Sequence, residues 1–241
     1  MRFCSHFIHR IPSSCVLCGE TNPSLLCDEC QKNLPILSQC CPQCARFLPS
    51  DALNLRCGQC VSSSPPFDCT YALFPYQPPL IQLIIQLKFQ HHLSHAKVLG
   101  QLLIQAVNEK WYRNKPLPDL LLPVPLHPKR LRERGFNQAL EMLRPVAKAL
   151  SLPIDTQGVR RIKATQAQSG LSAKMRKQNI ARAFAVQRDY SGRHIAVVDD
   201  VITTGHTVTA LCHALKQQGA KHIDVWCAAR RDCPSSQDTI N

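Results

Sequence analysis

The most informative stretch of the sequence spans residues 195–207 and reads Ile-Ala-Val-Val-Asp-Asp-Val-Ile-Thr-Thr-Gly-His-Thr. It passes from a short apolar strand into two adjacent acidic residues, then into a loop of threonine and glycine, and then into a helix. Backbone N–H groups of such a loop, together with the start of the following helix, form a site for a phosphate group. The stretch therefore predicts a phosphate-binding loop at the end of a strand.

The side chains of this stretch suit a ribose 5-phosphate. Threonine hydroxyls can donate to phosphate oxygens, and Gly205 permits a backbone conformation, or a close ligand approach, that a Cβ atom would obstruct. The two acids can accept hydrogen bonds from the ribose hydroxyls. The predicted ligand contacts are Asp199, Asp200, Thr203, Thr204, Gly205, His206 and Thr207. The alternative is an ordinary buried strand and turn, which leaves the paired acids, the threonines and the glycine as separate coincidences.

A second loop, within residues 122–139, carries a dense positive charge. It follows a predicted strand at 120–124 and leads into a predicted helix at 136–150, so it belongs at the same edge of the sheet as the phosphate loop. Arginines hold pyrophosphate oxygens in bidentate geometry. We therefore predict pyrophosphate contacts from Arg130, Arg134 and Gly135, and a helix cap at Asn137. A helix start with solvated charges is the alternative.

A third stretch, residues 163–179, is polar, basic and poor in apolar residues. Its charges include Lys163, Lys174, Arg176 and Lys177. The composition is typical of a loop that folds over a bound anion and excludes water. A plain surface excursion and a contact with nucleic acid remain alternatives.

Cysteines dominate the N-terminal part of the chain, which holds eleven of the fourteen within residues 1–69. Eight of them form four Cys-x-x-Cys pairs: Cys15/Cys18, Cys27/Cys30, Cys41/Cys44 and Cys57/Cys60. Two residues between thiolates let both sulfurs face one metal ion, and two such pairs complete a tetrahedral Cys4 site. We therefore expect two structural Zn²⁺ ions. Sequential pairing is the simplest arrangement and interleaved pairing the alternative, while a disulfide framework is disfavoured in a reducing compartment.

The positive charge is unevenly distributed. The net charge is +13, yet residues 1–70 carry five basic and five acidic side chains, and residues 125–185 carry thirteen basic against three acidic ones. Such a surface attracts polyanions, either a pyrophosphate-bearing small molecule or a nucleic acid. Histidines, among them His91, His92 and His95, have no companion acid at a ligand spacing, which disfavours a zinc-dependent enzyme.

The chain divides into two parts of unlike composition. We expect a small zinc module at residues 1–66, whose last part, 61–66, is a linker, and an α/β domain at 67–241. In the second part, helical patterns at 79–89, 94–111, 136–150 and 206–218 alternate with apolar strands at 120–124, 195–198 and 223–229. Pro145 is expected to bend or break its helix. This alternation predicts a mostly parallel sheet flanked by helices, with ligands at the carboxyl ends of the strands.

No apolar run reaches the length of a membrane span, and residues 1–12 lack the apolar core of a signal peptide. We therefore expect a cytoplasmic protein with no membrane insertion.

The phosphate loop resembles the phosphoribosyl-pyrophosphate (PRPP) motif of type I phosphoribosyltransferases, with Ala196 smaller than usual. The whole chain resembles the ComF/GntX family of competence-associated proteins. The resemblance rests on Cys-x-x-Cys-Gly at 15–19, Leu-Cys-x-x-Cys at 26–30, Leu-Lys-Phe at 87–89, Pro-Val-Pro-Leu at 123–126, Arg-Gly-Phe-Asn-Gln at 134–138, Gln-Ser-Gly-Leu-Ser at 168–172, Arg-Lys-Gln-Asn at 176–179 and the loop at 198–207. It implies a double zinc ribbon followed by a type I phosphoribosyltransferase-like domain.

The resemblance also implies a role in natural transformation, acting on incoming single-stranded DNA beside recombination and helicase proteins. Two functions follow. The first is a DNA-uptake protein that binds PRPP, with Mg²⁺, or a nucleotide-like phosphate ligand. The second is an active phosphoribosyltransferase that transfers the group to an unidentified nucleobase-like acceptor; no catalytic residue is assigned, and the sequence contains no recognisable base-binding hood.

Overall fold

The computed structural model describes residues 13–49, 55–163 and 183–231. Its centre is a sheet of four parallel strands in the order β3-β8-β7-β4. These strands are β3 (Cys69–Pro75), β4 (Leu120–Pro123), β7 (His194–Ile202) and β8 (His222–Arg230). The predicted α/β fold with a parallel sheet is confirmed.

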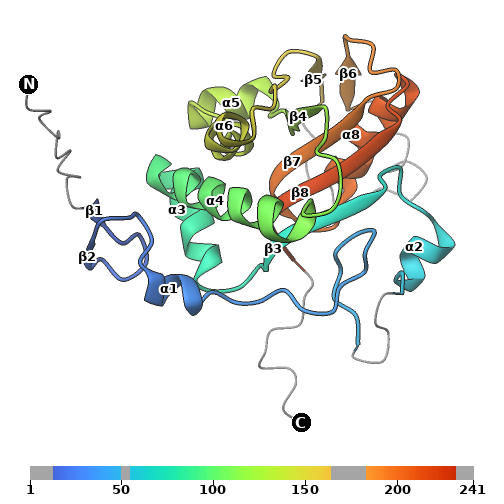
Figure 1. Cartoon of the computed structure of the whole chain (residues 1–241). Helices are drawn as coiled ribbons and strands as arrows, with labels where there is room; N and C mark the ends of the chain where they lie inside the picture. The colour runs from blue at the N-terminus through green and yellow to red at the C-terminus, as the bar shows by residue number, and fades with distance from the viewer. Residues whose placement is uncertain (1–12, 50–54, 164–182, 232–241) are drawn as a thin grey trace, which may run out of the picture.

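Helices cover both faces of this sheet (Figure 1). One face carries α3 (Leu80–Gln90), α4 (Leu93–Ala106), which continues as a π-helical turn (Val107–Trp111), and α6 (Gln138–Leu150); the other carries α8 (His206–Gln217). Strand β7 alternates between the two cores: Ala196 and Val198 pack with α4 and α6, whereas Ile195 and Val197 pack with α8. Both faces of the strand are buried, as expected for a parallel sheet.

The acids of the phosphate stretch lie within strand β7, which is longer than its apolar pattern predicts. The strand was expected to stop at Val198, but it continues through Asp199 and Asp200 to Ile202. It does so because Asp199, Val201 and Ile202 still pair with β8. The carboxylates are therefore held by the sheet rather than by a loop.

Helix α6 runs through Pro145 without a break, so the expected interruption does not occur. The proline ring lies against Gly100 of α4, where an added Cβ atom would come within 2.5 Å of Pro145 Cγ and 2.7 Å of the Met142 carbonyl oxygen. A side chain at position 100 would therefore force the two helices apart.

Three smaller elements lie between β4 and β7 in the sequence. Helix α5 (Pro128–Arg134) follows β4, and an antiparallel pair is formed by β5 (Val159–Arg161) and β6 (Phe184–Val186). None of the three was expected from the sequence. Helix α5 is short because Gly135, with φ of 75°, ends it after seven residues.

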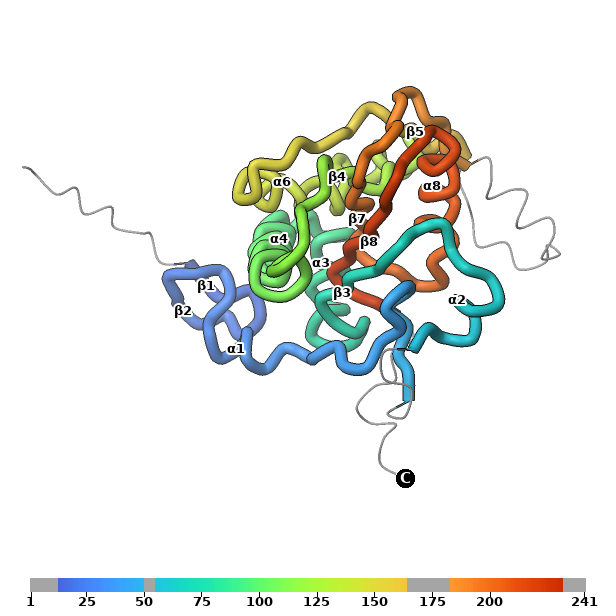
Figure 2. Tube along the Cα trace, turned by 45° about the vertical axis from the view of Figure 1, so that its right-hand side comes forward, coloured from blue at the N-terminus to red at the C-terminus, as the bar shows by residue number. Residues whose placement is uncertain are grey.

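The cysteine-rich region lies along one side of the α/β domain. It contains β1 (Ser13–Ser14), β2 (Thr21–Asn22), α1 (Asp28–Lys32) and α2 (Gly58–Ser62). Figure 2 places β1, β2 and α1 beside α3 and α4, and α2 at the opposite end, near α8. Helix α2 takes in the first two residues of the expected 61–66 linker.

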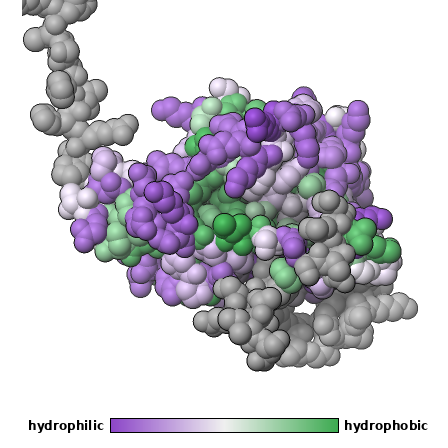
Figure 3. Space-filling view, turned by 60° about the horizontal axis from the view of Figure 1, so that its bottom comes forward, coloured by the Kyte–Doolittle hydropathy of each residue, from purple (hydrophilic) through white to green (hydrophobic). Residues whose placement is uncertain are grey.

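The segment between the two ends of this region crosses the lower side of the molecule in Figure 1. Ile36 in this segment is 83 % exposed. Seen from below, hydrophobic residues gather near the middle of the face and hydrophilic ones surround them (Figure 3). Among the described helices, none has the length and apolar character needed to cross a membrane.

Candidate functional site

The carboxyl ends of the strands bring the sequence-predicted loops to one edge of the sheet. Strand β7 leads into residues 203–205 and α8, β4 leads through residues 124–127 into α5, and β3 leads into α3. Gly205 caps α8 with φ of 79°, and an added Cβ atom would meet only Ile202 Cγ2, at 3.9 Å. The left-handed conformation, rather than crowding within the chain, is therefore what requires glycine here.

The two acids at the end of β7 differ in environment. Asp200 is 7 % exposed and forms an ion pair of 2.6 Å with Lys88 Nζ at the end of α3. Withdrawal from solvent, reinforced by the charge of Asp200, raises the pKa of Asp199 well above its usual range. The pair thus has one carboxylate neutralised by a lysine and a neighbour that resists ionisation.

Two arginines add positive charge to this edge. Burial lowers the pKa of Arg134, at the end of α5, while the negative charges of Asp200 and Asp199 oppose that shift. Burial likewise lowers the pKa of Arg161 on β5, and the charge of Asp199 opposes it. Both guanidinium groups therefore act electrostatically on the paired acids. The Arg134 guanidinium also lies 5.4 Å from the centre of the Phe89 ring.

The remaining predicted contacts have varied positions. Asn137 caps α6, as predicted: its Oδ1 accepts from the backbone N–H groups of Ala139 and Leu140. Arg130 is exposed on α5, and Lys163 is exposed at the edge of an undescribed segment. The predicted contacts Lys174, Arg176 and Lys177 lie outside the described residues.

Sequence reasoning missed two charged residues at this edge. Lys88 appeared only within the Leu-Lys-Phe stretch, and its position in the last turn of α3 gives no sign of a distant carboxylate partner. Arg161 lies on a strand that was not predicted. The tertiary fold brings both residues to this edge, and no local sequence pattern predicts that.

Arg230, at the end of β8, is a third residue that the sequence patterns did not indicate. Its side chain is buried, and its Nη1 donates to the carbonyl oxygens of Ile202 and Thr203, while its Nε donates to the Cys44 carbonyl oxygen at 3.0 Å. One side chain therefore connects the start of the phosphate loop to a Cys-x-x-Cys turn.

A cavity of about 520 Å³ lies between this Cys-x-x-Cys region and the start of α8. Its lining includes Arg46, Phe67, Thr204, His206 and His213. The Nε atom of Arg46 is buried with no hydrogen-bond partner among the described residues. Because Thr204 and His206 line the cavity, it adjoins the phosphate loop directly.

The eight predicted zinc ligands form two separate clusters, each with its four ligand atoms within 4.8 Å of one another. The first cluster is Cys15, Cys18, Cys27 and Cys30; the second cluster is Cys41, Cys44, Cys57 and Cys60. Sequential pairing of the four turns is therefore the observed arrangement. The sulfur atoms of Cys18 and Cys27 are 3.8 Å apart and those of Cys44 and Cys57 3.6 Å apart, which matches the edge of about 3.8 Å of a tetrahedron with Zn–S bonds of about 2.3 Å.

Two family models match separate parts of the chain. A family model described as a double zinc ribbon domain matches residues 10–61, and one described as a phosphoribosyl transferase domain matches residues 137–239. The DNA utilization protein YhgH of Salmonella typhi is 37 % identical over 206 residues, which cover 85 % of this chain and 90 % of that protein. Competence protein F of Haemophilus influenzae is 36 % identical over 209 residues, with the same coverage.

The chain belongs to the ComF/GntX family. The resemblance drawn from the sequence is thereby confirmed. So is the double zinc ribbon, whose two ligand sets are the first and second clusters.

In each cluster one thiol has a lowered pKa, whereas the pKa values of Cys18 and Cys30 in the first cluster and of Cys44 and Cys60 in the second are raised. Burial opposes ionisation of Cys15, but backbone N–H donors, including that of Cys18, lower its pKa to about 6. In the second cluster, backbone donors overcome burial in the same way and lower the pKa of Cys41 to about 7. Four cysteine ligands leave no open position, so zinc bound there would hold the fold rather than take part in a reaction.

Proposed function

We propose that the loop after β7 binds PRPP, or a related nucleotide-like phosphate ligand, and that the protein uses this site in natural transformation and DNA uptake. The observation that carries the proposal is the meeting of the paired acids, the Thr-Thr-Gly turn and the start of α8 at one edge, with Lys88 and Arg134 beside them. A helix N-terminus of this kind favours phosphate through its free N–H groups and its dipole.

Each group has a defined task in this proposal. The backbone of residues 203–207 and the threonine hydroxyls hold the 5-phosphate, and Asp199 and Asp200 accept from the ribose hydroxyls. Arg130, Arg134 and Gly135 hold the pyrophosphate, and Mg²⁺ accompanies PRPP because it bridges phosphate oxygens readily. We propose that the predicted loop at 163–179, of which 164–179 lie outside the described residues, covers the ligand. The cavity beside Thr204 offers room for a further part of a nucleotide-like ligand.

The DNA role rests on the names of the relatives and on charge. Two relatives of this chain are called DNA utilization protein and competence protein, and residues 125–185 carry a large excess of basic side chains. We propose single-stranded DNA as a partner, with recombination and helicase proteins beside it in the cytoplasm. The chain would work as a zinc module at 1–66 and an α/β domain at 67–241.

Calorimetry with PRPP and Mg²⁺ tests the ligand. The full-length protein should bind, and the Asp199→Ala/Asp200→Ala double variant should lose affinity by at least tenfold, about 1.4 kcal/mol. Asp189→Ala removes an exposed carboxylate at the opposite edge and should bind as the unaltered protein does. No binding to the unaltered protein, or equal binding by the double variant, contradicts the proposal.

Charge reversal of Lys174, Arg176 and Lys177 tests the DNA partner. It should lower the affinity for single-stranded DNA and flatten its dependence on salt, because fewer counterions are released. Unchanged binding would remove this segment from the DNA site.

An active phosphoribosyltransferase is the second candidate, favoured by the cavity that adjoins the phosphate loop and could hold an acceptor. Release of pyrophosphate from PRPP, measured with and without candidate nucleobases, separates the two. Base-dependent release supports turnover, whereas tight binding without release supports a binding role.

A further inference from the structure

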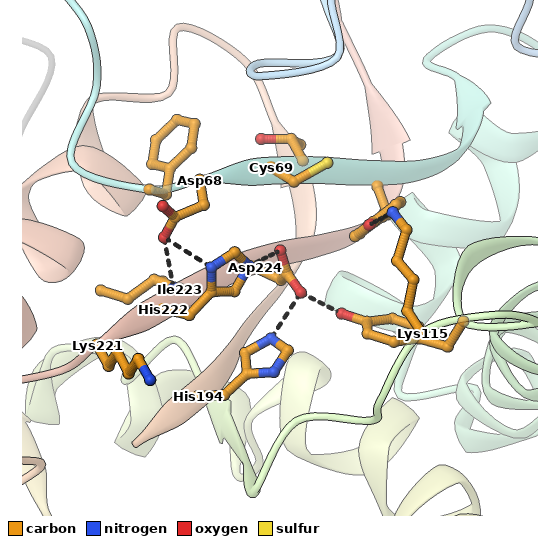
Figure 4. Close-up of polar contacts among 12 residues, drawn as sticks. Asp68, Cys69, Lys115, His194, Lys221, His222, Ile223 and Asp224 are labelled. Atoms are coloured by element: carbon orange, nitrogen blue, oxygen red, sulfur yellow. Dashed lines mark hydrogen bonds and ion pairs between the residues drawn. The ribbon is translucent and has the colours of Figure 1, made fainter. Parts of the chain in front are cut away.

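A cluster of histidine and carboxylate side chains lies at the amino edge of the sheet, opposite the phosphate loop (Figure 4). His194 begins β7 and His222 begins β8, and the two are direct partners in the parallel register. Asp224 lies two residues after His222, so its side chain points to the same face. The fold thus brings His194 next to His222 and Asp224, which lie 28 and 30 positions further along the sequence.

The three side chains lie close together, each with a ligand atom within 4.8 Å of those of the other two. His194 Nε2 lies 2.7 Å from Asp224 Oδ2, and His222 Nε2 lies 3.1 Å from Asp224 Oδ1. The ring centres of the two histidines are 4.5 Å apart. Ligand atoms on one metal with bonds of about 2.1 Å are about 3.0–3.4 Å apart, so a small widening of this arrangement accommodates an ion.

The hydrogen-bond partners around Asp224 and His222 resemble those that hold metal ligands in place in other proteins. Asp224 is 2 % exposed and also accepts from the Tyr112 hydroxyl, which in turn accepts from Trp226 Nε1. The second ring nitrogen of His222, Nδ1, lies 3.5 Å from Asp68 Oδ2. A carboxylate on the far nitrogen of a ligating histidine fixes the ring and raises its basicity.

The cluster is also accessible. The His222 side chain is 44 % exposed, so an ion has a route in and a water molecule has room to complete its coordination. Cys69, across the sheet from Asp224, donates to the Pro42 carbonyl oxygen and is not counted among the ligands.

We propose that His194, His222 and Asp224 form a third metal site, which binds a divalent ion of the zinc class and leaves one coordination position open to water. Two imidazoles and one carboxylate suit Zn²⁺, Co²⁺ or Ni²⁺ better than Mg²⁺. This site differs from the two Cys4 clusters, whose four sulfurs close the coordination sphere. It is separate from the phosphate loop, so its test is independent of the proposed function.

Zinc titration of the untagged full-length protein, with both Cys4 clusters already loaded, tests the site. Elemental analysis after equilibrium dialysis should give three ions per chain, and two in His222→Ala. The partly exposed His222 side chain makes that variant compatible with folding. His213→Ala, which removes an exposed histidine of α8, is the matched control and should retain three.

Two further measurements distinguish an ion at this site from a purely hydrogen-bonded cluster and from exchange into a Cys4 cluster. Asp68→Asn should weaken the third ion by about 10–100-fold, the usual cost of losing a carboxylate behind a ligating histidine. Co²⁺ at this site should give absorption without the thiolate charge-transfer bands that exchange into a Cys4 cluster produces. Two ions in the unaltered protein at saturating zinc would show a hydrogen-bonded network only, and a third ion with unchanged affinity in His222→Ala would show that it binds elsewhere. Either result would overturn the proposal.

Discussion

The two cysteine clusters share a motif but are attached to the α/β domain in different ways. The first cluster is held by apolar packing: Cys15, Leu26 and Leu34 belong to the core that contains α4. Its side-chain link to α4, between Gln31 and Gln105, is exposed.

The second cluster is attached by buried hydrogen bonds. Thr70 Oγ1 donates to the Gln43 carbonyl oxygen, and Arg230 joins the Cys44 carbonyl oxygen to those of Ile202 and Thr203. Equal ligand sets therefore do not imply equal roles. The first cluster stabilises a surface, whereas the second supports the loop that we propose to bind phosphate.

The largest expected effect comes from removing one ligand of each cluster. Cys30→Ser and Cys60→Ser should each lose one zinc ion and lower the melting temperature. Only Cys60→Ser should also weaken PRPP binding, because loss of the second cluster frees the Cys44 carbonyl oxygen from Arg230. Losing a hydrogen bond to a charged group costs about 1.5–3 kcal/mol, and 1.4 kcal/mol is tenfold, so the affinity should fall by about tenfold or more.

Zinc content, thermal unfolding and calorimetry on both variants make this measurement. Equal losses of PRPP affinity in the two variants would end the distinction between the clusters. Cys40→Ser is the control, since Cys40 lies outside both ligand sets.

Substituting Arg230, which connects the second cluster to the phosphate loop, should cost less stability than losing a zinc ion. Arg230→Gln should lower the free energy of unfolding by about 3 kcal/mol, because it leaves buried carbonyl groups without their donor. Arg230→Lys keeps the charge but not the planar fork, so it should recover only part of the loss. Urea unfolding measures both, with zinc content as the check that the second cluster stays loaded. The proposed role of Arg230 would be contradicted if Arg230→Gln lowered the free energy of unfolding no more than the substitution of an exposed arginine, such as Arg144→Gln.

The smallest effect is expected from removing the carboxylate of Asp199. This change alters the charge of the phosphate site but leaves its contacts with the second cluster in place. The raised pKa of Asp199 means that the folded state keeps a proton that the unfolded state has lost. Stability therefore falls as pH rises from the ordinary aspartate value of about 3.9 towards the raised one. Asp199→Asn should remove that fall, stabilising the protein at neutral pH by on the order of 1 kcal/mol, with the gain vanishing in acid. Thermal unfolding across this pH range measures it; parallel pH profiles for the two proteins would contradict the assignment.

Local patterns sufficed for much of this molecule. The Cys-x-x-Cys spacing predicted both clusters, and the apolar periodicities predicted α3, α4, α6, α8 and the two central strands, since each is long and strongly patterned. Elements of three residues, such as β5, carry too little pattern to be found. Pro145 does not interrupt α6, and its ring lies against Gly100, 45 positions away, in a tertiary contact that the local pattern does not show.

The site was harder to predict than the fold. Asp199 and Asp200 were found because they are adjacent to the loop, whereas Lys88 and Arg230 reach it through the tertiary fold. The histidines were dismissed for lack of a nearby acid. Yet His194 meets Asp224 only because β7 and β8 pair in one register.

Strand β8 links the proposed metal site to the phosphate loop. Its nine residues begin at His222, in the proposed metal site, and end at Arg230, beneath the phosphate loop. The strand is hydrogen-bonded to β3 on one side and β7 on the other, so its length of roughly 30 Å is fixed. A sliding step of one residue would turn every side chain to the wrong face. The strand thus holds the proposed metal site and the phosphate loop at a fixed separation.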